Sequence, residues 1–74
     1  MPRPIPLKDV LTALKKEGFC FVSQKGSHAK YRKSGSNIRT VIVPMHGKEI
    51  PHGTFRSILR QAGISEADFF SDRN

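Results

Sequence analysis

The stretch QKGSHAKYR, residues 24–32, decides the fold of this chain, and the other segments are arranged around it. After Gly26 the residues alternate between polar and apolar, as in a strand whose side chains point to opposite faces in turn. If Ala29 and Tyr31 pack inward, the residues between and beside them face solvent. These solvent-facing residues are His28, Lys30 and Arg32. The stretch therefore predicts a strand that follows a flexible glycine turn and carries an imidazole beside two cations. This arrangement is suited to binding and cleaving a phosphodiester.

Two more strands are predicted on either side of this one. Residues 19–24 are aromatic and β-branched, and residues 38–43 are β-branched up to Pro44, which cannot continue a ladder. The polar residues 34–37 have the length and composition of a hairpin loop. The predicted sheet therefore consists of the segments 19–24, 28–33 and 38–43, in antiparallel order.

Amphipathic helices are predicted before and after the strands. Each has apolar residues spaced i, i+3, i+4 and i+7, which places them on one face of a helix. The apolar sets are Leu7, Val10, Leu11 and Leu14 in the first helix and Phe55, Ile58, Leu59 and Ala62 in the second. Pro6 suits the first helical position of the first helix, and Gly18 suits its end. The second helix is expected to begin near Gly53 or Thr54 and to stop at Gly63.

These elements predict an α+β fold of two layers in one domain, residues 1–74. The order is helix, three antiparallel strands, helix, followed by a short terminal helix with Ser65 as its N-cap. Because each long helix has a single apolar face, both helices are expected to cover the same face of the sheet. The other face, which carries His28, is left to solvent.

The length and charge of the chain restrict its partners. A chain of 74 residues buries only about 60% of its unfolded surface, so a shallow surface site is expected rather than a deep pocket. The net charge is +7 and no acidic residue lies between Phe19 and Lys48. The cations in that interval are Lys25, Lys30, Arg32, Lys33, Arg39 and Lys48. This distribution indicates a polyanionic partner, although a charge run can also be an ordinary solvated face.

One cysteine, Cys20, rules out an internal disulfide and is typical of a reducing compartment. Cys20 lies in an apolar run, so a buried and inert thiol is expected. No apolar stretch approaches the roughly 20 residues of a membrane span, and the first residues lack the core of a signal peptide. A cytoplasmic protein that does not associate with a membrane is expected.

Four segments, in this order and spacing, resemble the HicA toxin family, whose members are also called YcfA-like proteins. The segments are LKKEGF (residues 14–19), KGSH (25–28), VPMHGKEI (43–50) and GTFRSILRQAGI (53–64). The resemblance implies a fold like that of double-stranded-RNA-binding domains and cleavage of mRNA without a metal, as the toxin of a toxin–antitoxin pair. It also implies that His28, in the Gly-Ser-His motif, is catalytic, and that a HicB-like antitoxin covers the site.

The residues around His28 fit that chemistry. Cleavage of RNA without a metal needs a base for the 2′-hydroxyl, an acid for the leaving oxygen and cations on the phosphoryl oxygens. An imidazole, with a reference pKa of about 6.5, can exchange protons near neutral pH. The other residues expected to contact RNA are Lys25, Gly26, Ser27, Lys30, Arg32, His46 and Lys48. Among these, Gly26 would let backbone N–H groups approach the phosphate, and Ser27 could donate to the phosphate or orient the ring.

Other interpretations remain open for the same residues. His28 could be an ordinary strand histidine in a non-catalytic RNA-binding module, or the basic face could dock an acidic protein. A metal site at His46, Glu49 and His52 is disfavoured because the loop offers no cysteine and only one acid. No metal, cofactor or small-molecule ligand is therefore expected. His46 could instead be a turn residue and His52 polar surface, and Tyr31 is expected to pack in the core rather than stack on a base.

Overall fold

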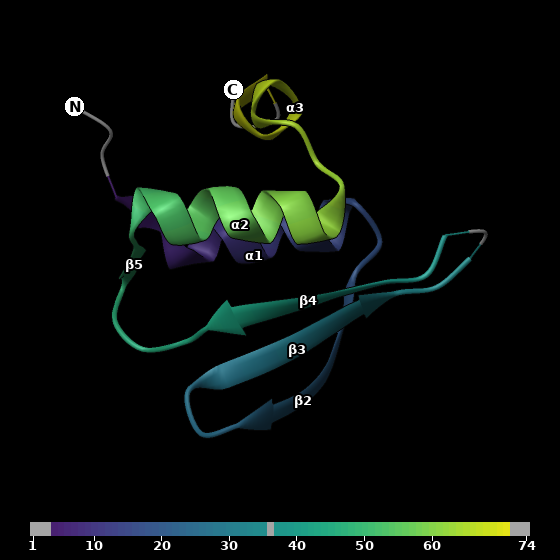
Figure 1. Cartoon of the computed structure of the whole chain (residues 1–74), viewed down its shortest axis with the longest axis horizontal. Coiled ribbons are helices and arrows are strands. Elements are labelled where there is room, and N and C mark those ends of the chain that lie inside the picture. Colours follow the sequence, from purple (N-terminus) through teal and green to yellow (C-terminus); the bar gives the residue numbers. More distant parts are fainter. Residues whose placement is uncertain (1–3, 36, 72–74) are drawn as a thin grey trace.

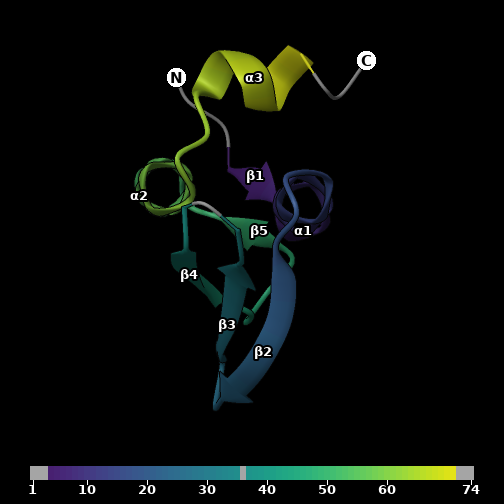
Figure 2. The same cartoon turned by 90° about the vertical axis from the view of Figure 1, so that its right-hand side faces the viewer.

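The computed structural model describes residues 4–35 and 37–71 of the chain (Figure 1). The elements are β1 (Ile5–Pro6), α1 (Leu7–Lys16), β2 (Cys20–Lys25), β3 (His28–Lys33), β4 (Arg39–Pro44), β5 (Glu49–Ile50), α2 (His52–Ala62) and α3 (Glu66–Ser71). Strands β2, β3 and β4 form an antiparallel sheet in that order. Helices α1 and α2 lie on the same side of this sheet (Figures 1 and 2). The predicted α+β architecture with both helices on one face is therefore confirmed.

Helix α1 packs through the apolar face that its spacing predicts. Val10 and Leu14 are each 1% exposed, and Ala13 is buried beside them, whereas Leu7 and Leu11 are only partly buried. Pro6 is the N-cap of α1 and belongs to β1, so its prediction as the first helical position was wrong by one residue. The chain leaves α1 through Gly18, whose φ of 94° is in the left-handed region that favours glycine.

Strand β3 has the predicted bounds, and its burial alternates as predicted. Ala29 and Tyr31 are buried, and the residues on the opposite face are exposed. Strands β2 and β4 each begin and end one residue later than predicted. Pro44, which was predicted to lie just after the third strand, is the last residue of β4. Pro44 is tolerated there because β4 is an edge strand. In the hairpin loop at residues 34–37, Ser36 lies outside the described residues.

Cys20 is exposed, which corrects the prediction of a buried thiol. Cys20 is paired with Arg32 across β2 and β3, and directly paired residues of an antiparallel sheet share a face. Arg32 faces solvent, so Cys20 does as well. The buried member of the apolar run is its neighbour Phe19, which is 2% exposed.

A second, two-stranded sheet was not predicted. Strand β1 pairs with β5, and the partners Ile5 and Ile50 are both buried. The segment between β4 and α2 was predicted to be a loop, but part of it forms β5. Through the pairing with β1, this segment is held next to the start of α1. The backbone N–H of Leu7 extends the join by donating to the carbonyl oxygen of Lys48 at 2.8 Å.

Helix α2 buries its predicted apolar face and ends at Gly63, whose φ is 73°. It begins earlier than predicted, at His52, which is half-buried and has its Nδ1 enclosed without a hydrogen-bond partner. The prediction of His52 as plain polar surface was therefore wrong. Helix α3 begins as predicted, with Ser65 Oγ accepting a hydrogen bond from the N–H of Asp68 at 3.0 Å. It packs Phe69 against Phe55.

Candidate functional site

The face of the three-stranded sheet away from α1 and α2 carries most of the predicted site residues. We call it the outer face, and it consists of Cys20, Ser23, Lys25, His28, Lys30, Arg32, Thr40, Ile42 and Pro44. Pairing across the strands arranges these side chains in three rows, because directly paired residues share a face. The rows are Lys25–His28–Pro44, Ser23–Lys30–Ile42 and Cys20–Arg32–Thr40. Successive rows are about 7 Å apart, which is the rise of two strand residues.

His28 lies at the end of the outer face, where the turn between β2 and β3 enters β3. Gly26 has a φ of 60°, a backbone conformation that favours glycine, although a Cβ there would meet no atom within 4 Å. The side chain of Gln24 fastens the turn by donating from Nε2 to the carbonyl oxygen of Gly26 at 3.0 Å. The His28 side chain is exposed at the first residue of β3, next to this turn. Lys25 of β2 is paired with it on one side and Pro44 of β4 on the other.

Positive charge lies beside His28 on β2 and β3 and is not neutralised within the sheet. The cations of the outer face are Lys25, Lys30 and Arg32, all exposed. Strands β2, β3 and β4 contain no acidic residue. The outer face thus combines one imidazole with three cations that are open to an anionic ligand, which is the combination that stabilises charge on a phosphate.

The loop that carries His46 is tied to the turn before His28. The backbone N–H of Met45 donates to the carbonyl oxygen of Ser27. His46 follows Met45 directly and is exposed. The structure thus brings the start of this loop, which is distant in sequence, to the Gly26–Ser27 turn.

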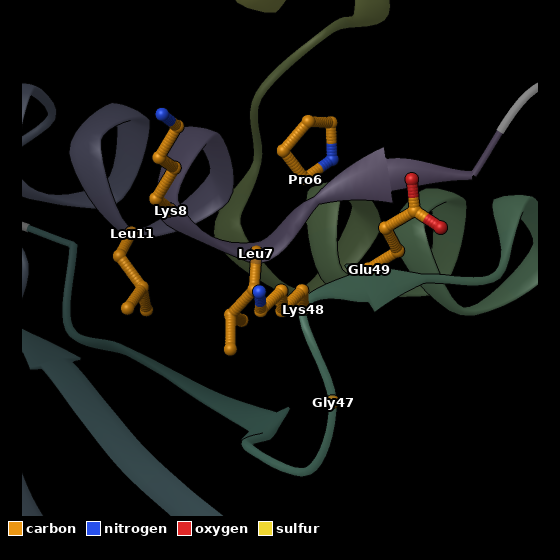
Figure 3. Close-up of a pocket in the computed structure, with 7 residues that line it drawn as sticks. All are labelled: Pro6, Leu7, Lys8, Leu11, Gly47, Lys48 and Glu49. Carbon is orange, nitrogen blue, oxygen red and sulfur yellow. The ribbon is translucent and has the colours of Figure 1, made fainter.

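Lys48 is not brought to the outer face. It lies at the start of α1, where it lines a hollow of about 470 Å³ together with Leu7 and Leu11 (Figure 3). The remaining lining residues are Pro6, Lys8, Gly47 and Glu49. The structure thus separates Lys48 from the group of predicted contacts at the turn and on β3.

One residue that supports the site from behind the sheet was missed in the sequence. Gln61 of α2 accepts a hydrogen bond from the backbone N–H of Ile42 through its Oε1, at 3.1 Å. This bond satisfies an N–H on the outer edge of β4 and fixes that strand against α2. No signal in the sequence separates Gln61 from an ordinary exposed helix residue, because the contact depends on how α2 crosses the sheet.

The described residues contain neither a cluster of metal ligands nor a membrane-spanning helix. Within residues 4–35 and 37–71, no three His, Cys, Asp or Glu side chains are grouped so that they could hold a metal ion. Among the helices that the structure describes, none has both the length and the apolar character needed to cross a membrane.

Comparison with known proteins gives one family. The model of the family described as the HicA toxin of bacterial toxin–antitoxin systems matches residues 7–64. The matched region runs from the start of α1 to the residue after Gly63, and so includes the whole outer face. No match was found among the curated proteins.

Proposed function

Because this chain belongs to the HicA toxin family of bacterial toxin–antitoxin systems, we propose that it is an endoribonuclease that cleaves mRNA without a metal ion. His28 is the catalytic group of this proposal. The observation that carries it is the position of His28: an exposed imidazole at the end of a sheet face that holds three cations and no acid. mRNA as the substrate places the activity in the cytoplasm.

The reaction that fits these groups is attack of the 2′-hydroxyl on the adjacent phosphorus. His28 takes the proton of the 2′-hydroxyl, a bond forms between the 2′-oxygen and phosphorus, and the bond from phosphorus to the 5′-oxygen breaks. The products are a 2′,3′-cyclic phosphate and a free 5′-hydroxyl. A positioned base of this kind contributes roughly 10²- to 10⁴-fold to a rate.

The leaving 5′-oxygen needs a proton that His28 cannot supply in the same step. His46 is the candidate for this second group, because the bond from Met45 N–H to the Ser27 carbonyl oxygen ties its loop to the turn before His28. His52 is excluded from this role by its half-buried place at the start of α2, against Phe55.

The cations of the outer face hold the scissile phosphate and balance the charge that develops on it. Lys25 is paired with His28 and lies in the same row. Lys30 is two residues further along β3 and lies in the next row. The Gly26–Ser27 turn offers backbone N–H groups and one hydroxyl at the same lip. Positioned donors of this kind stabilise the transition state more than the ground state.

We also propose that residues 1–74 form a single toxin domain and that a HicB-like antitoxin inhibits it by covering the outer face. The single domain is supported by the core, in which the buried residues of α1, the sheet, α2 and α3 form one cluster. The antitoxin is supported by the family, whose description includes a toxin–antitoxin pairing. A partner with an acidic surface would complement the outer face.

The experiment that tests the function is incubation of an end-labelled mRNA with the purified protein in EDTA. The expected result is cleavage, with fragments that carry a 2′,3′-cyclic phosphate and a 5′-hydroxyl. A mock purification from cells without the protein controls for contaminating nuclease. Binding of the mRNA without cleavage would instead favour the second candidate function, a non-catalytic RNA-binding module, which the cationic outer face also supports.

A further inference from the structure

The outer face is divided lengthwise by charge. All three of its cations lie on β2 and β3, as does His28. The residues that β4 contributes are Thr40, Ile42 and Pro44, and none is charged. We call these three residues the uncharged stripe. Ile42 is at its centre and leaves 38% of its surface exposed.

The uncharged stripe runs directly beside the cations. Ile42 is paired with Lys30, and Pro44 is paired with His28. Neighbouring strands are about 4.8 Å apart, so an apolar side chain lies within one strand spacing of each of these two groups. On the other side of β3, the paired residues are Ser23 and Lys25, which are polar.

This division matches the two sides of a single nucleic-acid strand. The phosphates of such a strand are anionic, whereas its unpaired bases have apolar faces that gain from leaving water. If the phosphates follow the cations of β3, the bases on the β4 side meet Ile42 and Pro44. Duplex RNA keeps its base faces stacked inside the helix, so its bases cannot pack against the uncharged stripe.

The aromatic side chains of the sheet are not available for this contact. Tyr31 is only 6% exposed and lies on the inner face. Phe21 is paired with Tyr31 and meets its ring edge to face, with centroids 5.7 Å apart, so it also lies on the inner face. Among the residues paired with β3 on the outer face, the exposed aliphatic side chain beside the cations is therefore Ile42 of β4.

Ile42 is also held in place before any ligand arrives. Its N–H donates to Gln61 Oε1, and the neighbouring residues Val41 and Val43 are both fully buried in the core. With its backbone fixed and a β-branched side chain that is stiff at χ1, Ile42 loses little conformational entropy when a base covers it.

We propose that single-stranded RNA lies along the outer face with its phosphates on β3 and its bases over Ile42 and Pro44. Pro44 then contacts a base at the scissile phosphate, and Ile42 contacts a base of the neighbouring nucleotide, one row away. This inference rests on the proposed function only in taking RNA as the ligand.

The test measures equilibrium binding by fluorescence anisotropy in the His28→Ala background, which prevents cleavage. Two labelled probes are compared: a short oligouridine and an abasic oligonucleotide of the same length, which has the phosphates but no bases. The variant is Ile42→Thr, which keeps the β-branched shape and the backbone bond to Gln61. The matched control is Val22→Thr, since Val22 is 50% exposed on β2, the edge strand opposite β4, and has no pairing partner on β3.

The expected result is a loss of about three- to tenfold in affinity of Ile42→Thr for oligouridine, as for covering part of an aliphatic side chain. Its affinity for the abasic probe is expected to stay within about twofold. Val22→Thr should change neither affinity. The proposal is overturned if Ile42→Thr weakens both probes equally, or if it behaves like Val22→Thr.

The outcome is separable from that of the proposed function. If the wild-type protein does not cleave mRNA but Ile42→Thr still loses affinity only for the probe with bases, the catalytic proposal fails and the base contact stands. If the wild-type protein cleaves and Ile42→Thr binds both probes normally, the base contact alone fails.

Discussion

Replacement of Lys30 by glutamine tests whether RNA is bound on the outer face. Lys30 is exposed at the centre of that face and is paired with Ser23 and Ile42, neither of which is charged. Each phosphate of a single strand that a cation neutralises contributes about 0.7 to the slope of log affinity against log salt. Three cations on the outer face therefore predict a slope of about −2 from this face.

Lys30→Gln is expected to make that slope shallower by about 0.7 and to lower the affinity at low salt. The assay is anisotropy with a labelled single-stranded RNA over a salt series, again in the His28→Ala background. The matched control is Lys8→Gln, which makes the same change in net charge. Lys8 is exposed on α1, in the helical layer on the other side of the sheet (Figure 2).

Equal slopes for Lys30→Gln and Lys8→Gln would refute the placement of RNA on the outer face. Such a result would mean that RNA responds to the net charge of the protein, wherever the charge lies. A shallower slope for Lys30→Gln alone would support the placement, because the two variants differ only in the position of the lost charge.

Three further predictions concern the fold. Gly63→Ala should lower the free energy of unfolding in urea by about 1–2 kcal/mol, because its φ of 73° is left-handed. Gly53→Ala, inside α2 with open space around it, should raise the free energy of unfolding by up to about 1 kcal/mol. An equal loss of stability in the two glycine variants would contradict the role of the left-handed backbone at Gly63. Ile50→Ala should cost about 2–5 kcal/mol because Ile50 is 1% exposed in the β1–β5 sheet. Ile38→Ala, at a residue 63% exposed, should stay within about 0.5 kcal/mol, and similar costs for both would count against that sheet. Cys20 should react with a thiol reagent in the native protein, and a reaction that requires denaturant would contradict its exposure.

Strand β3 could be predicted from the sequence because its signal is local. Strict alternation of polar and apolar residues across residues 28–32 sets the strand, its faces and the exposure of His28. The two long helices were predictable for the same reason, since each shows its apolar period within one segment.

The features that could not be predicted depend on contacts between distant segments. Strands β1 and β5 have two residues each, too few to show a period, and they are defined only by their pairing. Cys20 reads as buried because its neighbours are apolar, but its exposure is set by its pairing with Arg32. The charge run reads as one surface, whereas the structure places Lys48 beside α1 and not on the outer face.

In the proposed function, His28 performs the chemistry and does not merely bind RNA. The most direct test is the single-turnover rate of mRNA cleavage in EDTA by His28→Ala, at saturating protein. Ser23→Ala is the matched control, since Ser23 is exposed on the same face one row away. Circular dichroism is used to check that both variants are folded. We expect His28→Ala to lose at least about 10²-fold in rate while its RNA affinity stays within about twofold, and Ser23→Ala to cleave nearly as the wild type does. Cleavage by His28→Ala at the wild-type rate would contradict the claim.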